Sequence, residues 1–148
     1  MTFRLRPVLR FRKYQEQSRK RRLAEALAVE NEQKETALRY AGMRQQAAGR
    51  FRSEQEKGWL DVRRLIDRRV YLSLLDRELQ DQLQVVAKAE LETGRRRGDL
   101  AEAMKARKAL EVLEDRARRR QRAAQDRAET AEMDEVAVGV HRRGRGDG

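Results

Sequence analysis

The feature that most constrains this sequence of 148 residues is the absence of proline after Pro7. A proline inside a helix removes a backbone hydrogen bond and kinks the chain, so nothing in residues 8–148 forces a helix to break. Apolar residues recur at spacings of three and four, the period of one helix face. Charged residues make up 41% of the chain and aromatic residues only 5%, which is too little apolar bulk for a thick globular core. We therefore predict an all-α fold of long helices that each bury one narrow stripe.

The first predicted helix covers residues 4–56 and carries a weak stripe. Alanine at the inward positions lets two helices approach closely, but it buries little area at about 25 cal/mol per Å². We expect this helix to be only modestly stabilised by its partner. Its expected stripe comprises Leu23, Leu27, Ala37, Ala41, Ala48 and Phe51, with polar Glu30, Lys34 and Arg44 on the same track.

A turn is predicted at residues 57–61, because Gly58 can end a helix and Asp61 can cap the next one. The second helix is predicted over 62–138 with a stronger stripe. We expect the segment Glu92–Asp99, which contains two glycines, to interrupt this stripe and shift its phase. Residues 139–148 lack apolar periodicity and are expected to be a disordered basic tail. The expected inward residues of the second helix are Val62, Leu65, Leu72, Leu79, Leu83 and Val86.

Together these elements predict a long two-helix antiparallel coiled-coil hairpin that forms a single domain over residues 1–148. One continuous helix of this length would extend about 200 Å and would need a second chain to cover its stripe. A parallel homodimer remains an alternative. The break at Gly58 and Trp59 favours the hairpin.

Residues that could support catalysis are scarce. The chain has no cysteine, and its single histidine, His141, lies in the glycine- and arginine-rich C-terminal stretch. No glycine-rich phosphate-binding loop occurs. We therefore predict a protein that is not an enzyme and has no cofactor, metal ion or small-molecule substrate. No apolar run is long enough for a membrane-spanning helix.

The formal net charge of +11 favours acidic partners. Two arginine runs, at 95–97 and 118–122, contain no aromatic residue of the kind that stacks on single-stranded nucleic acid. We interpret both runs as solvated helix faces that are partly paired with nearby carboxylates, and we do not expect a nucleic-acid partner. A basic coiled-coil protein that binds nucleic acid remains an alternative. Trp59 and Tyr71 are interpreted either as packing at the hairpin tip or as partner contacts.

Four stretches, taken in order, resemble one known family. They are FRLRPVLRFRKYQE (3–16), RVYLSLLDRELQDQ (69–82), LEVLEDRARRRQ (110–121) and AEMDEVA (131–137). Over roughly residues 3–137 the chain resembles the FliJ family of flagellar type III export proteins. A counterpart in virulence-type secretion and a purely structural homodimeric rod remain alternatives.

The resemblance implies a non-enzymatic part of the flagellar export apparatus, required for flagellum assembly, motility and chemotaxis. Such a protein would be a stalk in the hexameric export ATPase ring. It would link the ring to the cytoplasmic domain of the export gate protein and to export chaperones, in the cytoplasm at the inner face of the cell membrane. By position, the gate-docking residues would be Tyr71, Leu75, Glu78 and Gln82, although the family tends to be uncharged where Glu78 stands. The ring-contact residues would be Arg4, Arg6, Arg10, Arg12, Met133, Asp134 and Glu135.

Overall fold

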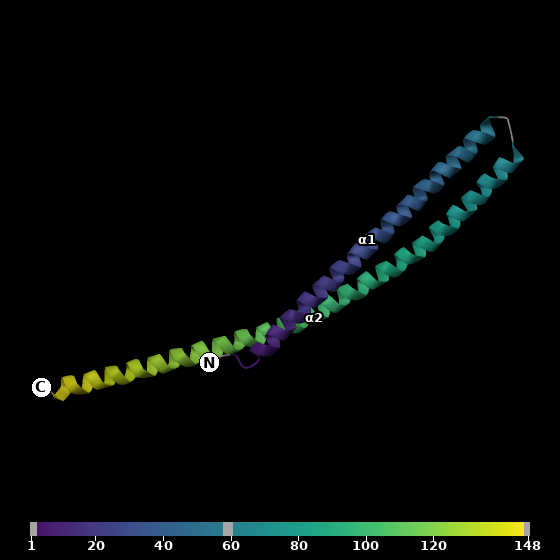
Figure 1. Ribbon diagram of the computed structural model, residues 1–148. Coiled ribbons are helices and arrows are strands. Elements are labelled where there is room, and N and C mark those ends of the chain that lie inside the picture. Colours follow the sequence, from purple (N-terminus) through teal and green to yellow (C-terminus); the bar gives the residue numbers. More distant parts are fainter. Residues whose placement is uncertain (1–2, 58–60, 147–148) are drawn as a thin grey trace. The chain divides into compact units, whose positions relative to one another are not determined.

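The computed structural model describes residues 3–57 and 61–146. In these residues it contains two helices, α1 (Arg6–Glu56) and α2 (Val62–Gly146), and no strand. The two helices pack against each other in opposite directions (Figure 1), so the predicted all-α helical hairpin is confirmed. The expected turn residues Gly58 and Trp59 lie outside the described residues.

Local hydrogen bonds account for two of the helix ends. At the start of α1, the backbone N–H of Arg6 donates to the carbonyl oxygen of Phe3 at 3.1 Å, one residue before Pro7 enters the first turn. At the start of α2, the N–H of Arg63 donates to Oδ1 of Asp61 at 3.1 Å, which confirms Asp61 as the predicted cap. α1 ends at Glu56, where the sequence predicted its end.

The C-terminal end of α2 differs from the prediction. The helix continues to Gly146 instead of ending at residue 138, so the expectation of a disordered tail is wrong for residues 139–146. No proline interrupts this stretch, and each further residue adds a backbone hydrogen bond to an existing helix. Arg143 and Arg145 lie in the last turn, where positive charge is favourable beside the helix dipole.

The seam is the line of residues at which each helix faces the other. On α1 it follows a three-four repeat with one gap between Tyr40 and Ala47, where Arg44 is exposed. The predicted residues Leu23, Ala37 and Phe51 lie in it. The alternate positions of the repeat lie one residue before the predicted ones. Tyr40 and Ala47 face inward, whereas Ala41, which was predicted to face inward, is exposed. Tyr40 offers more apolar surface than the alanine that the prediction placed inside. The α1 seam comprises Leu9, Arg12, Glu16, Arg19, Leu23, Ala26, Glu30, Gln33, Ala37, Tyr40, Ala47, Phe51 and Glu54.

The seam of α2 has no such gap, and the predicted phase shift at Glu92–Asp99 is wrong. Thr93 is only 2% exposed and keeps the repeat in phase. Its hydroxyl donates to the carbonyl oxygen of Ala89 at 3.1 Å, which satisfies a polar group inside the seam. Val62 and Leu83, both predicted to face inward, are exposed. The α2 seam comprises Leu65, Arg68, Leu72, Leu75, Leu79, Gln82, Val86, Ala89, Thr93, Arg96, Leu100, Ala103, Arg107, Leu110, Glu114 and Ala117.

The chain divides into two compact units. One unit is Glu16–Glu102, where α1 and α2 pack through buried Ala37, Ala47, Leu75 and Val86. The other unit combines Met1–Gln15 with Ala103–Gly148, and there buried Leu9 anchors the start of α1 on α2.

The second unit ends in a long unaccompanied helix. We call residues 125–146 of α2 the overhang, because they lie beyond the place where the start of α1 meets α2 (Figure 1). Every residue in the overhang except Gly139 is exposed. Within the described helices, neither one is long and apolar enough to cross a membrane.

Candidate protein-docking surfaces

Polar contacts across the seam fix how the two helices align within Glu16–Glu102. Gln82 Nε2 donates both to the carbonyl oxygen of Gln33 at 3.0 Å and to its Oε1 at 2.7 Å. Nearer the turn, Arg68 Nε lies 2.6 Å from Glu54 Oε2. Glu54 comes after Gln33 in α1, whereas its partner Arg68 comes before Gln82 in α2. This order shows that the two helices are antiparallel. A slip along the seam would break these bonds together.

A charged group also lies at the seam. We call Glu30, Lys34, Glu90 and Thr93 the Glu30 layer. Lys34 Nζ is 3.0 Å from Glu30 Oε1 and 3.5 Å from Glu90 Oε1, so one ammonium group joins carboxylates of both helices. The hydrogen bond from Lys34 lowers the pKa of Glu30 below its ordinary value, and the same bond raises the pKa of Lys34. These contacts favour the ionised forms of Glu30 and Lys34.

The four residues expected to dock the export gate do not share one free face. Leu75 is only 4% exposed and packs in the seam, where Gln82 is held by Gln33. Tyr71 and Glu78 lie beside the seam and are exposed. Of the four, these two are accessible to a partner while the hairpin is closed.

A surface that the sequence reading missed lies on the opposite side of the same stretch. We call Val62, Ile66, Val70 and Leu74 the outer ridge. They recur every fourth residue, and they are 65%, 57%, 62% and 53% exposed. At 100° per residue each step of four turns the row by about 40°, so it runs from about a quarter turn beside the seam at Val62 to about half a turn from it at Val70. The spacing of these four residues is visible in the sequence, but the prediction places Val62 on the inward stripe.

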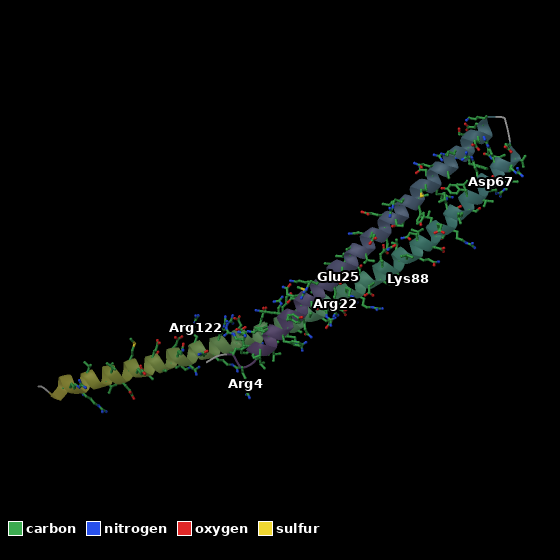
Figure 2. The ribbon with its side chains drawn as sticks, viewed as in Figure 1. Arg4, Arg22, Glu25, Asp67, Lys88 and Arg122 are labelled. Atoms are coloured by element: carbon green, nitrogen blue, oxygen red, sulfur yellow. The ribbon has the colours of Figure 1, made fainter. Side chains whose placement is uncertain are left out.

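Of the four arginines expected to contact the ATPase ring, Arg4 and Arg6 line a groove where α1 begins. Arg4, Arg6 and Arg10 are exposed, and Arg12 is half-buried with its guanidinium donating to Gln15 Oε1 at 3.1 Å. The apolar part of the groove comes from Phe3, Leu5, Ala117 and Ala124, and Arg4, Arg6, Arg118 and Arg120 supply positive charge. Figure 2 labels Arg4 and Arg122 in this region.

Met133, Asp134 and Glu135, also expected at the ring, are exposed on the overhang. Nine residues separate Met133 from Ala124 in the groove, which is about 13 Å along a helix. The structure therefore separates the expected ring-contact residues into an arginine cluster at the groove and a short acidic segment farther along α2.

The two arginine runs match their interpretation as partly paired helix faces. Arg96 Nε lies 2.9 Å from Glu92 Oε1, and Arg118 lies 3.0 Å from Glu114 Oε1. Arg119 approaches Asp115 at 3.9 Å. These are contacts three or four residues apart along one helix, and each contributes at most modestly to stability. Across residues 3–57 and 61–146, no group of three or more histidine, cysteine or acidic residues could hold a metal ion.

A comparison with known protein families gives one result. The family model described as the flagellar FliJ protein matches residues 1–146 of the chain. No curated protein and no solved structure matches it.

Proposed function

Because the chain belongs to the FliJ family of flagellar export proteins, we propose that it is the stalk of the flagellar export ATPase ring and links that ring to the export gate and to export chaperones. The match over residues 1–146 carries this proposal, since it takes in both helices and the whole overhang. A non-enzymatic stalk needs long helices with a charged surface, and the described residues supply both. The place of action would be the cytoplasm at the inner face of the cell membrane.

The end of the molecule that contains the groove is the part that we assign to the ring. Arg4, Arg6, Arg10 and Arg12 have no carboxylate within residues 3–15 to neutralise them. Positive charge at this density attracts acidic loops, and it raises the rate of association most at low salt. Met133, Asp134 and Glu135 on the overhang would supply a second contact, with the opposite sign of charge.

A charge-reversal experiment tests the ring contact. Changing Arg4, Arg6 and Arg10 to Glu should weaken binding to the purified export ATPase at physiological salt. The matched control changes Arg50, Arg52 and Lys57 to Glu, which alters the net charge equally at exposed positions near the other end of α1. Equal binding by the two variants would remove the assignment of the ring to this end.

The gate contact is assigned to the exposed pair Tyr71 and Glu78. Leu75 and Gln82 would support that surface from within the seam, because they hold α2 against α1. Mutation of Tyr71 to Ala should reduce binding to the cytoplasmic domain of the export gate without changing helix content.

A deletion strain tests the function as a whole. Loss of the gene should stop filament export and motility, and expression of the full chain should restore both. Normal flagella in the deletion strain would contradict the proposal. A counterpart of virulence-type secretion would leave the filament intact and remove effector secretion instead.

A further inference from the structure

The seam of α2 does not end where its partner helix ends. The three-four repeat that reaches Ala117 continues through Gln121, Ala124, Ala128 and Ala131. The start of α1 lies beside the first part of this continuation, at the groove. All four further positions are nevertheless exposed, so α1 leaves this part of the seam open. A face with coiled-coil spacing is normally covered by another helix.

The charges along the same stretch are segregated by sign. Residues 116–125 contain five arginines and no carboxylate, whereas residues 126–135 contain five carboxylates and one arginine, Arg127. A helix that covers the whole stretch must therefore be acidic over the first half and basic over the second. A second copy of α2 laid antiparallel has this order of charge by symmetry, whereas a parallel copy would place like charges together.

The basic half is only partly neutralised within its own chain. Arg118 lies 3.0 Å from Glu114 Oε1 and Arg119 lies 3.9 Å from Asp115 Oδ2. Among the described residues, no carboxylate forms an ion pair with Arg120. Positive charge therefore remains beside the groove for a partner to meet.

We infer that this end of α2 is a self-association surface, on which two copies of the chain pair antiparallel over residues 117–135. Continuing the seam sets the register, because facing positions in an antiparallel pair are related by a two-fold axis. Ala124 of one copy then faces Ala128 of the second copy, and Gln121 faces Ala131. Alanine at these layers lets the two helices approach closely.

In this register the flanking charges are complementary. Arg118 meets Glu132 of the second copy and Arg120 meets Asp134, and symmetry makes each pair occur twice. Glu135 of the second copy faces Ala117 at the groove, where Arg4 and Arg6 add positive charge. Ion pairs at such flanking positions set the partner and the orientation of a coiled coil.

One contact opposes the pairing, and its length is limited. Arg127 faces its own counterpart across the two-fold axis, so R127Q should strengthen association. Beyond Glu135 the second copy would reach the part of the seam that α1 already covers through buried Leu9. About 28 Å of helix is therefore paired. A short interface built on alanine gives a weak dimer that depends on concentration.

Sedimentation equilibrium of the full chain, from about 5 μM to about 500 μM, tests this inference. R118E/R120E should raise the dimer Kd at least tenfold, because four opposite-charge pairs become like-charge pairs, and E132R/D134R should do the same. An equimolar mixture of these two variants should dimerise like the wild type, since every pair is again of opposite sign. The matched control R50E/R52E changes the net charge equally at exposed positions of α1 and should associate no more weakly than the wild type.

A wild type that stays monomeric at every concentration would overturn the inference. So would a dimer that R118E/R120E leaves unchanged, or a mixture of the two variants that stays monomeric. Circular dichroism should show equal helix content for all proteins, because the changed side chains are exposed. None of these results bears on the proposed function, which does not require a second copy.

Single cysteines test the antiparallel register. Q125C lies beside the two-fold axis and should form a disulfide with its counterpart on mild oxidation, giving about twice the 17.4 kDa mass on a non-reducing gel. Q121C should not, because the two copies of residue 121 lie ten residues apart, about 15 Å along the helix. Linkage of Q121C without linkage of Q125C would indicate parallel pairing and would overturn the inference.

Discussion

At the residue scale, neighbouring side chains of α2 have opposite environments. Leu75 packs against α1, whereas Leu74 projects from the outer ridge. Both are leucines in the same helical turn, so sequence composition does not distinguish them. Their difference follows from the phase of the seam, and it separates a structural residue from a residue free to meet a partner.

Truncation of these two leucines should therefore give different stabilities. L75A should lower the free energy of unfolding by about 2 kcal/mol, at the low end for buried leucines because a two-helix seam can relax around the lost side chain. L74A should change it by less than about 0.5 kcal/mol, as is usual at exposed positions. Urea titrations followed by circular dichroism measure both. Equal losses would show that Leu74 is covered in the isolated protein.

The Glu30 layer makes stability depend on pH in a defined direction. Because the pKa of Glu30 is lowered in the folded protein, its contribution is present above the ordinary value of 4.5 and is lost as pH falls through the lowered pKa. Lys34 has a raised pKa, so its contribution is present below 10.5 and is lost as pH rises through the folded value.

We expect E30Q to melt at a lower temperature than the wild type at neutral pH, and the difference to shrink on acidification below the ordinary pKa. Thermal melts by circular dichroism from neutral pH to about pH 3 measure this. The control E32Q, on the exposed face of the same helix, should follow the wild type. A difference between E30Q and wild type that stays constant with pH would contradict the role given to the Glu30 carboxylate.

At the scale of the elements, the helix ends near the turn could be predicted and the details of the seam could not. As expected, α1 ends at Glu56 and Asp61 caps the start of α2. These ends could be predicted because capping is a local interaction. Half of the inward positions of α1 differ by one residue from the prediction, because alanines and polar residues make two adjacent faces nearly equal in hydrophobicity. The partner helix decides between them, as Gln33 shows by meeting Gln82.

Two glycines illustrate the same point. Gly94 and Gly98 suggested an interruption, but both lie in continuous helix on its exposed side. A Cβ atom added at either position would meet nothing within 4 Å. G94A and G98A should each stabilise the protein by roughly 0.5–1 kcal/mol, because alanine loses less backbone freedom on folding. Lower melting temperatures in these variants would show that the segment needs a conformation other than helix.

At the scale of the whole molecule, the sequence left a hairpin and a parallel homodimer open. The contacts of Gln33 with Gln82 and of Glu54 with Arg68 select the hairpin, because they join residues far apart in one chain. The docking surfaces were predicted only in part. Tyr71 and Glu78 emerged from the resemblance and are accessible, whereas the outer ridge is recognisable only once α1 shows which face of α2 is occupied.

Cysteine cross-linking tests the hairpin directly, because the natural chain contains no cysteine. Q33C/Q82C should form a disulfide within one chain on mild oxidation, leaving the mass near 17.4 kDa on a non-reducing gel. Q33C/Q84C is the control, since Gln84 is exposed outside the seam. A product of twice the mass in Q33C/Q82C would indicate pairing between chains.

The overhang has a kinetic consequence. A free peptide must form a costly first turn before its helix can grow, but here the packed part of α2 already provides that nucleus. Residues 125–146 can therefore lose and regain helix from one end only, at rates typical of helix–coil exchange, within about a microsecond. Deuterium should enter their amides first, in order from the C-terminus inward, while the amides of the paired helices still retain hydrogen. A partner that binds the overhang would therefore meet a segment that can unfold and refold while α1 and α2 stay packed together.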